Sequence, residues 1–180
     1  MADLSGKKVA VLVDNYFEED EFTKPIEALK QAGASVEVIA AEPEEGKIQA
    51  MNHADKSKTY DYDKTLDEAN IDDYDALVLP GGAINADQLR MQDKARQWVK
   101  RVSEAGKPLA VICHAPWVLA SAGIAQGRKL TSFFTIQDDM RDAGANWVDE
   151  EVVVDGNIIT SCKPDDIPAF NDALISMMAS

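Results

Sequence analysis

Cys113 and His114 stand directly after an apolar run, Leu109–Ile112. The run predicts a buried strand, and the helical pattern over 114–122 places the thiol at a strand-to-helix junction. A thiol there faces the positive end of the helix dipole and several unpaired backbone N–H groups. Both favour the thiolate, so we predict a lowered pKa for Cys113 and a side chain projected outward, as in a nucleophile elbow. The alternative from position alone is a buried structural cysteine.

A Pro-Gly-Gly sequence, residues 80–82, ends another apolar run at 76–79. Two glycines after a strand let the backbone approach another group closely. The N–H of Gly82, together with the N–H of His114, would then point at an oxyanion that develops beside Cys113. The alternative is an ordinary turn at the end of a strand.

Four acidic side chains are crowded into the stretch NYFEEDE, residues 15–21. Carboxylates near the start of a helix usually only stabilise the helix dipole. Four of them in so short a stretch exceed that need. We therefore expect Glu18, which precedes the helical register, to turn back into the cleft, where it would hydrogen-bond the cysteine or carry a proton.

These residues need a scaffold of alternating strands and helices. Apolar runs predict strands over 7–13, 35–41, 76–79, 109–112 and 129–133, and a hairpin over 152–154 and 157–161 around Asp155-Gly156. Helical spacing predicts helices over 20–32, 93–104, 114–122, 136–143 and 167–178. Pro25 fits best in a first turn, which delays the first helix to Thr23. The polar stretch 42–62 predicts a loop with a short edge hairpin.

This alternation predicts an α/β three-layer sandwich with a mainly parallel sheet, as a single domain over 1–180. In such a sheet, sites form at the carboxyl ends of the strands. Residues 14–19, 80–82 and 113–114 all follow strand ends, so we expect them to converge on one cleft.

Composition excludes several classes of function. The chain carries 18 basic and 32 acidic side chains, a formal net charge of −14, which opposes binding to a nucleic-acid backbone or an anionic membrane. It has no apolar stretch long enough to span a bilayer and no signal-peptide layout. The two cysteines form neither a disulfide framework nor a zinc pattern, and we expect no metal and no cofactor. The default compartment is the cytoplasm.

The motifs together resemble one known family over nearly the whole chain and in the same order. The segments that carry the resemblance are KKVAVLVDNYFEEDEF at 7–22, YDALVLPGG at 74–82, KPLAVICHAPWVLASAGI at 107–124, GRKLTS at 127–132, DDMRDAGANWVDEEVVVDGNIITS at 138–161 and PDDIPAF at 164–170. The chain resembles the DJ-1/PfpI superfamily, and within it the PfpI-like branch of stress proteins.

The resemblance implies a flavodoxin-like sandwich, similar to class I glutamine amidotransferases. It also implies a nucleophilic Cys113, an elbow histidine at His114, an acid at Glu18 that contacts the thiol, and oxyanion donors in the backbones of Gly82 and His114. Members of the family act as intracellular peptidases, as glyoxalases, as deglycases of methylglyoxal adducts, or as chaperone-like stress proteins. They form homo-oligomers, dimers or larger, and some complete the site with an acid from the neighbouring subunit.

Two positions depart from the family pattern. Cys162, in TSCKPDD, stands where the family commonly has an arginine, and the loss of that cation puts anion binding near the site in doubt. His114 directly follows Cys113, and adjacent residues at a helix start point in different directions, which argues against His114 as the base. His53 lies in a polar loop, where a lone histidine is usually solvated.

We therefore expect a cysteine-dependent stress-response enzyme without a cofactor, acting on carbonyl or acyl carbon. Its substrates would be small carbonyl compounds, glycated protein side chains or peptides, with Cys113 as the nucleophile and Glu18 managing a proton. The alternative is a redox-responsive stress protein or chaperone whose cysteine oxidises without substrate turnover.

Overall fold

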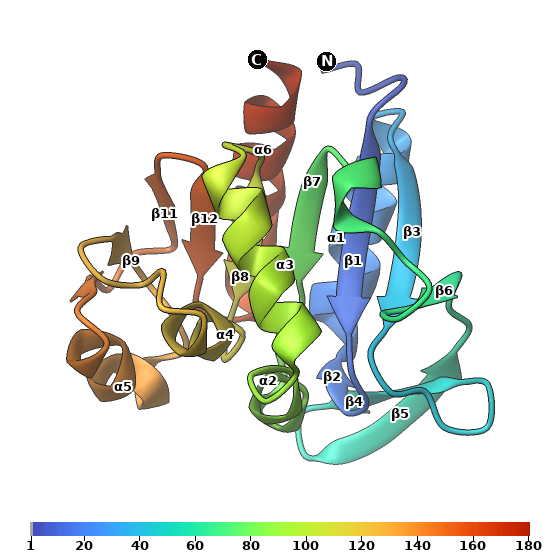
Figure 1. Ribbon diagram of the computed structural model, residues 1–180, viewed down its shortest axis with the longest axis horizontal. Coiled ribbons are helices and arrows are strands. Elements are labelled where there is room, and N and C mark those ends of the chain that lie inside the picture. The colour runs from blue at the N-terminus through green and yellow to red at the C-terminus, as the bar shows by residue number, and fades with distance from the viewer. Residues whose placement is uncertain (1) are drawn as a thin grey trace.

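The protein is built around one large, mainly parallel sheet, seen in the computed structural model, which describes residues 2–180 (Figure 1). The strand order is β11-β12-β8-β7-β1-β3-β6, and only β11 runs antiparallel to its neighbour. The strands of this sheet are β1 (Lys8–Val13), β3 (Ser35–Ala40), β6 (Lys64–Thr65), β7 (Ala76–Leu79), β8 (Leu109–Ile112), β11 (Val152–Asp155) and β12 (Ile158–Ser161).

Helices cover both faces of the sheet (Figure 1). One face packs against α1 (Glu19–Gln31) and α6 (Ile167–Ala179). The other packs against α2 (Ala83–Leu89), α3 (Asp93–Glu104), α4 (Pro116–Ser121) and α5 (Gln137–Asp142). Short 3₁₀ turns occupy Ile71–Asp73, Phe134–Ile136 and Pro164–Asp166. The predicted α/β three-layer sandwich is confirmed.

Successive side chains of the central strands point to opposite faces of the sheet, so the core is divided into two clusters, one on each face. In β1, Ala10 and Leu12 belong to the cluster under α3, whereas Val9, Val11 and Val13 belong to the cluster under α1 and α6. Every residue of β7 and β8 is buried, as expected for strands covered on both faces. Burial on both faces explains why these strands appear in the sequence as continuous apolar runs.

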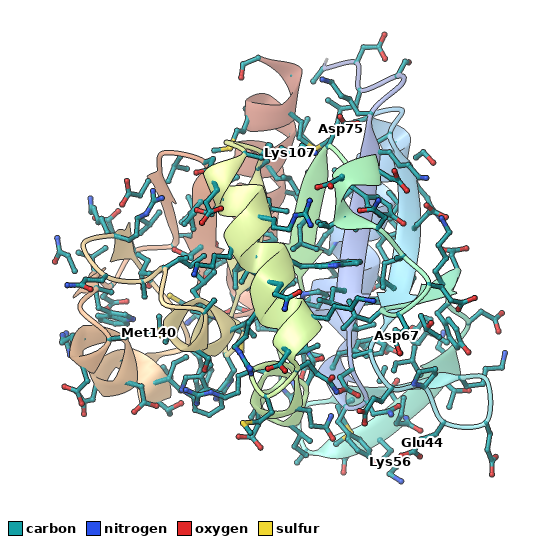
Figure 2. All side chains as sticks on the ribbon, viewed as in Figure 1. Glu44, Lys56, Asp67, Asp75, Lys107 and Met140 are labelled. Atoms are coloured by element: carbon teal, nitrogen blue, oxygen red, sulfur yellow. The ribbon has the colours of Figure 1, made fainter. Side chains whose placement is uncertain are left out.

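Two smaller sheets complete the fold. The strands β2 (Phe17–Glu18), β4 (Ile48–Asn52) and β5 (Asp55–Tyr60) form one, and β9 (Lys129–Leu130) pairs with β10 (Asn146–Trp147) in the other. The β4–β5 hairpin lies at the end of the molecule toward which β1 runs, opposite the two termini (Figure 1). Glu44 and Lys56 mark that end, and Asp75 and Lys107 mark the end with the termini (Figure 2).

The element boundaries differ from the prediction in three places. Helix α1 begins at Glu19 and holds Pro25 inside it, rather than beginning near Thr23, and Glu19 and Asp20 in its first turn stabilise the dipole. The strand predicted over 129–133 is only two residues long. Helix α2 was not predicted, because its seven residues show too little apolar periodicity.

Candidate active site

The end of β8 holds Cys113 in an unusual backbone conformation. Its φ is 67°, a left-handed value that non-glycine residues adopt rarely and at a cost of about 1–3 kcal/mol. The main chain is fixed on both sides: the Cys113 N–H donates to the Ser161 carbonyl at 2.9 Å, and its carbonyl accepts from the Phe133 N–H at 2.7 Å. This is a strained strand-to-helix turn, the backbone geometry that a nucleophile elbow requires.

Two glycines after β7 let three segments meet at the thiol. A Cβ on Gly81 would lie 2.3 Å from Glu21 Oε1 and 2.5 Å from the Cys113 Cβ, so only glycine fits between them. Gly82 has a φ of 96° and packs against the backbone of Tyr16 and Glu18. The backbone N–H groups of Gly82 and His114 favour the charged form of the Cys113 thiol and so oppose a rise in its pKa. They are the two N–H groups that the sequence predicts beside Cys113.

The acid beside the thiol is Glu21, in the first turn of α1, and not Glu18. The Glu21 side chain is fully buried, its Oε1 accepts from the Gly81 N–H at 2.9 Å, and its carboxyl lies within hydrogen-bonding reach of Cys113. Glu21 Oε2 has no N–H or O–H partner among residues 2–180. The thiol is therefore the natural partner for a proton carried on this carboxyl.

Burial raises the pKa of both members of this pair. It raises the pKa of Glu21 to about 8, and the nearby Glu18 charge adds to the effect, so Glu21 is mostly protonated at neutral pH. Burial also raises the pKa of the Cys113 thiol, with Glu21 as the next cause, while the N–H groups of Gly82 and His114 oppose the rise. The lowered pKa expected from the helix dipole is thus not found, because desolvation outweighs it.

His114 lies closer to the thiol than its position next to Cys113 suggested. Its Nδ1 is 3.3 Å from the Cys113 sulfur and its Nε2 is 3.4 Å from Thr135 Oγ1. The ring stacks on Phe133, with centroids 4.8 Å apart, and burial lowers its pKa, which favours the neutral form. The expectation that the two side chains diverge is therefore wrong, because the left-handed turn at Cys113 redirects both.

Glu18 occupies the rim of the same site. It ends β2, caps α1, and donates its backbone N–H to the Gly81 carbonyl at 3.1 Å. Its carboxylate accepts from the His53 N–H, with distances of 3.1 Å to Oε1 and 3.3 Å to Oε2. The predicted contact between Glu18 and the thiol is wrong: the turn before α1 aims Glu18 at the β4–β5 hairpin, and Glu21, one helical turn later, reaches the cysteine.

A cavity of about 660 Å³ joins these groups. It contains Cys113, His114, Glu18, Glu21 and Gly82, so the residues predicted for the site do share one cleft. The β4–β5 hairpin closes one side with Met51, His53 and Ala54, and the loop after β12 closes another with Lys163, Pro164 and Asp165. The remaining lining residues are Tyr16, Asp20, Ala83, Ile84 and Phe133.

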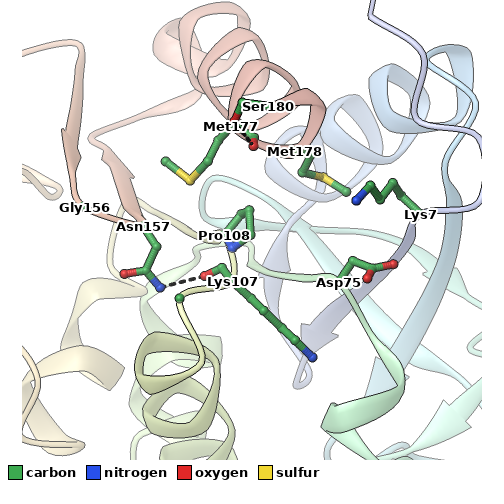
Figure 3. A pocket seen from close by; sticks show the side chains of 10 residues that line it. Lys7, Asp75, Lys107, Pro108, Gly156, Asn157, Met177, Met178 and Ser180 are labelled. Atoms are coloured by element: carbon green, nitrogen blue, oxygen red, sulfur yellow. Dashed lines mark hydrogen bonds between the residues drawn. The ribbon is translucent and has the colours of Figure 1, made fainter.

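A second cavity, of about 590 Å³, lies at the other end of the sheet (Figure 3). Lys7, Asp75, Lys107 and Met177 contribute to its wall, and Asn157 donates a hydrogen bond to the Lys107 carbonyl at 2.7 Å. None of the described residues that line it is a cysteine or a histidine. The Cys113 cavity is therefore the better candidate for an active site.

The second thiol, Cys162, does not enter the Cys113 cavity. It follows Ser161, next to Cys113 in the sheet, but its sulfur lies 2.9 Å from Thr131 Oγ1 and 3.4 Å from the Glu150 carbonyl. Both cysteines are free thiols. Lys163, the next residue in the sequence, does line that cavity.

Within residues 2–180, no cluster of three or more metal-ligating side chains is found. Across the same residues, no helix has the length and apolar character that crossing a membrane requires.

Known proteins are similar to this chain in sequence and in fold. The sequence model of the DJ-1/PfpI family matches residues 7–177. The chain is 42% identical over 171 residues to Deglycase PfpI of Pyrococcus furiosus, covering 95% of this chain and 99% of that one. It is 42% identical over 174 residues to General stress protein 18 of Bacillus subtilis, covering 96% and 98%. The crystal structure of Drosophila melanogaster DJ-1beta superposes with a TM-score of 0.88 at 28% identity, covering 96% and 90%.

Proposed function

This chain belongs to the DJ-1/PfpI family, and from the geometry of its Cys113 cavity we propose that it is a cysteine-dependent enzyme that attacks carbonyl carbon. The substrates are adducts of methylglyoxal with amine, guanidine or thiol side chains. The observation that carries the proposal is the strained Cys113, held between a buried carboxyl and two backbone N–H donors. A relative named as a deglycase, matched over its whole length, supports this substrate class.

The pairing of Cys113 with Glu21 provides a nucleophile. When the pair has lost one proton, that charge is shared between a carboxylate beside a thiol and a carboxylic acid beside a thiolate. In the first arrangement the thiol donates to the Glu21 carboxylate, and this contact lowers the pKa of Glu21. Passing the proton along the same contact gives the second arrangement, in which the N–H groups of Gly82 and His114 stabilise the thiolate. The thiolate then has a proton donor at hand for the oxygen or leaving group of the substrate.

The first step is addition of the Cys113 sulfur to the carbonyl carbon of the adduct. The new S–C bond takes the sulfur lone pair, and the carbonyl π pair moves to oxygen as an oxyanion. We propose that the Gly82 and His114 N–H groups, which favour the charged form of the sulfur, then donate to that oxygen. In this proposal His114 moves a proton between the sulfur, the substrate and the leaving group, because its Nδ1 lies 3.3 Å from the sulfur.

The overall reaction balances without an external oxidant or reductant. The adduct R–NH–CH(OH)–CO–CH₃ and one water give the free amine R–NH₂ and the hydroxy acid CH₃–CH(OH)–COOH. The former aldehyde carbon is oxidised to a carboxyl group and the ketone carbon is reduced to an alcohol within the same molecule. The chain therefore needs only its own acid–base groups and the thiol.

The test uses three substrates and one variant. Purified protein is mixed with methylglyoxal, with a methylglyoxal-treated amino acid and with a fluorogenic peptide, beside Cys113→Ala as the control. We expect release of hydroxy acid and free amine from the adduct, abolished in Cys113→Ala. Turnover of the peptide alone would instead indicate a peptidase. No turnover of any substrate, with one equivalent of peroxide consumed by Cys113, would overturn the proposal in favour of a redox sensor.

A further inference from the structure

Glu18 is a carboxylate with spare capacity to accept hydrogen bonds. Its side chain is only 13% exposed, yet its two oxygens share a single N–H donor, that of His53. The His53 imidazole lies farther off, with Nδ1 3.9 Å from Oε1, and its side chain is 80% exposed. A carboxylate has about four acceptor positions, so most of those on Glu18 remain open.

Glu21 does not compete with Glu18 for such donors. Its Oε1 is held by the Gly81 N–H, and its buried Oε2, which lacks an N–H or O–H partner in the described chain, carries the proton shared with Cys113. Glu18 and Glu21 are three residues apart at the start of α1, a spacing that places their side chains about 5–6 Å apart at Cβ. A poorly satisfied Glu18 carboxylate beside a neutral Glu21 calls for a ligand rich in N–H donors.

The other charged groups of the cavity leave Glu18 available. Asp20 already pairs with Lys24, at 3.4 Å. Asp165 and Lys163 come from the loop after β12, and neither forms an ion pair within 4 Å among residues 2–180. With Glu21 protonated and Asp20 paired with Lys24, Glu18 and Asp165 face one ammonium, that of Lys163, so the cavity favours a cation.

We infer that Glu18 is a specificity-determining residue that binds the guanidinium of an arginine adduct, so that this enzyme favours arginine adducts over thiol adducts. This rests on the proposed function. A guanidinium carries its charge at every physiological pH, and in arginine it presents five N–H donors in a planar fork that matches a carboxylate. The adduct replaces one of these N–H hydrogens with carbon and keeps the other donors. The thiol adduct of a cysteine has neither the charge nor the donors.

The bond between Glu18 and His53 explains how the carboxylate is aimed. His53 sits at the tip of the β4–β5 hairpin with a φ of 55°, and this turn directs its N–H at Glu18. The pairing of Phe17 with Ala50 and of Glu18 with Met51 fixes the hairpin to β2. The carboxylate is therefore positioned before a ligand arrives, which lowers the cost of binding.

The test compares two matched substrates, the methylglyoxal adducts of N-acetylarginine amide and of N-acetylcysteine amide. In Glu18→Gln we expect kcat/KM for the arginine adduct to fall about tenfold or more, mainly through KM, because a charged hydrogen bond is lost. For the cysteine adduct we expect a change of less than about twofold. Glu19→Gln is the control, since the Glu19 carboxylate binds Ser57 and Tyr60 outside the cavity.

An equal loss on both substrates would overturn the inference, because Glu18 would then act in the chemistry or in folding. No loss on either would overturn it as well.

A binding experiment separates this inference from the proposed function. Unmodified N-acetylarginine amide is titrated into wild type and Glu18→Gln by calorimetry. We expect affinity to fall about tenfold or more in the variant, whether or not wild type turns over any adduct. Equal affinity, or no binding to wild type, would contradict the inference.

Discussion

Replacing Glu21 by Gln should make the protein more stable at pH 8 than wild type while it destroys the proton-sharing pair. Burial raises the pKa of Glu21 from 4.5 to about 8 in the folded protein. Between these two values the unfolded chain has released the Glu21 proton and the folded chain has kept it. The folded state therefore binds more protons, and the free energy of unfolding falls as the pH rises through this range.

The size of the effect follows from the width of that range. It spans about 3.5 pH units, and each unit corresponds to about 1.36 kcal/mol. Wild type should thus lose stability, on the order of 4 kcal/mol, between pH 4.5 and 8 through this one group. In Glu21→Gln the amide oxygen can still accept from the Gly81 N–H, and no proton is bound or released in this range.

Urea unfolding of wild type and Glu21→Gln, measured at intervals from pH 5 to 8.5, tests the reasoning. Near pH 5 the two free energies of unfolding should be similar, and the variant should become progressively more stable as the pH rises. Taking the difference removes groups common to both proteins, such as Asp14, whose pKa burial raises to about 6. A difference that stays constant within about 1 kcal/mol over the whole range would refute the account of Glu21.

Three further predictions follow from the site. Gly81→Ala should abolish turnover and cost about 1–3 kcal/mol of stability in urea unfolding, because its Cβ would collide with Glu21 and Cys113; wild-type activity would contradict the geometry. Cys162→Ser should keep turnover within about twofold of wild type, because its sulfur faces Thr131; a loss above tenfold would place Cys162 in the site. Light scattering at micromolar concentration should give at least a dimer, and a monomer would contradict the expectation of a shared site.

The sequence predicts the scaffold well because each central strand is buried on both faces. Continuous apolar runs predict β7 and β8 with the observed boundaries, and helical spacing does the same for α3. The β4–β5 hairpin was expected only as a short hairpin somewhere within 42–62, because its strands are polar and half exposed. Its contact with the start of α1 joins segments that are far apart in sequence, and no local pattern indicates it.

Sequence patterns indicate the residues that backbone geometry brings to the cavity, and they miss the acid that burial brings there. Cys113, Gly82 and His114 follow from strand ends and glycines. Glu21 was missed within the acidic stretch, although one signal was present: Glu21, Pro25 and Leu29 recur every four residues on the buried face of α1. Extending that apolar face back by one turn would have identified the buried acid. The raised pKa of Cys113 has the same cause, since the sequence indicates the helix dipole next to the thiol but not how far burial desolvates it.

The central claim is that Cys113 reacts as one member of a proton-sharing pair with Glu21. The most direct measurement is the rate of Cys113 alkylation by iodoacetamide as a function of pH, with the modified residue located by peptide mass spectrometry. In wild type we expect an inflection no higher than about pH 8, because two groups share the first proton lost. In Glu21→Gln it should move to higher pH, since the thiolate loses the hydrogen bond from a carboxylic acid. An inflection at the same pH in both proteins would contradict the account.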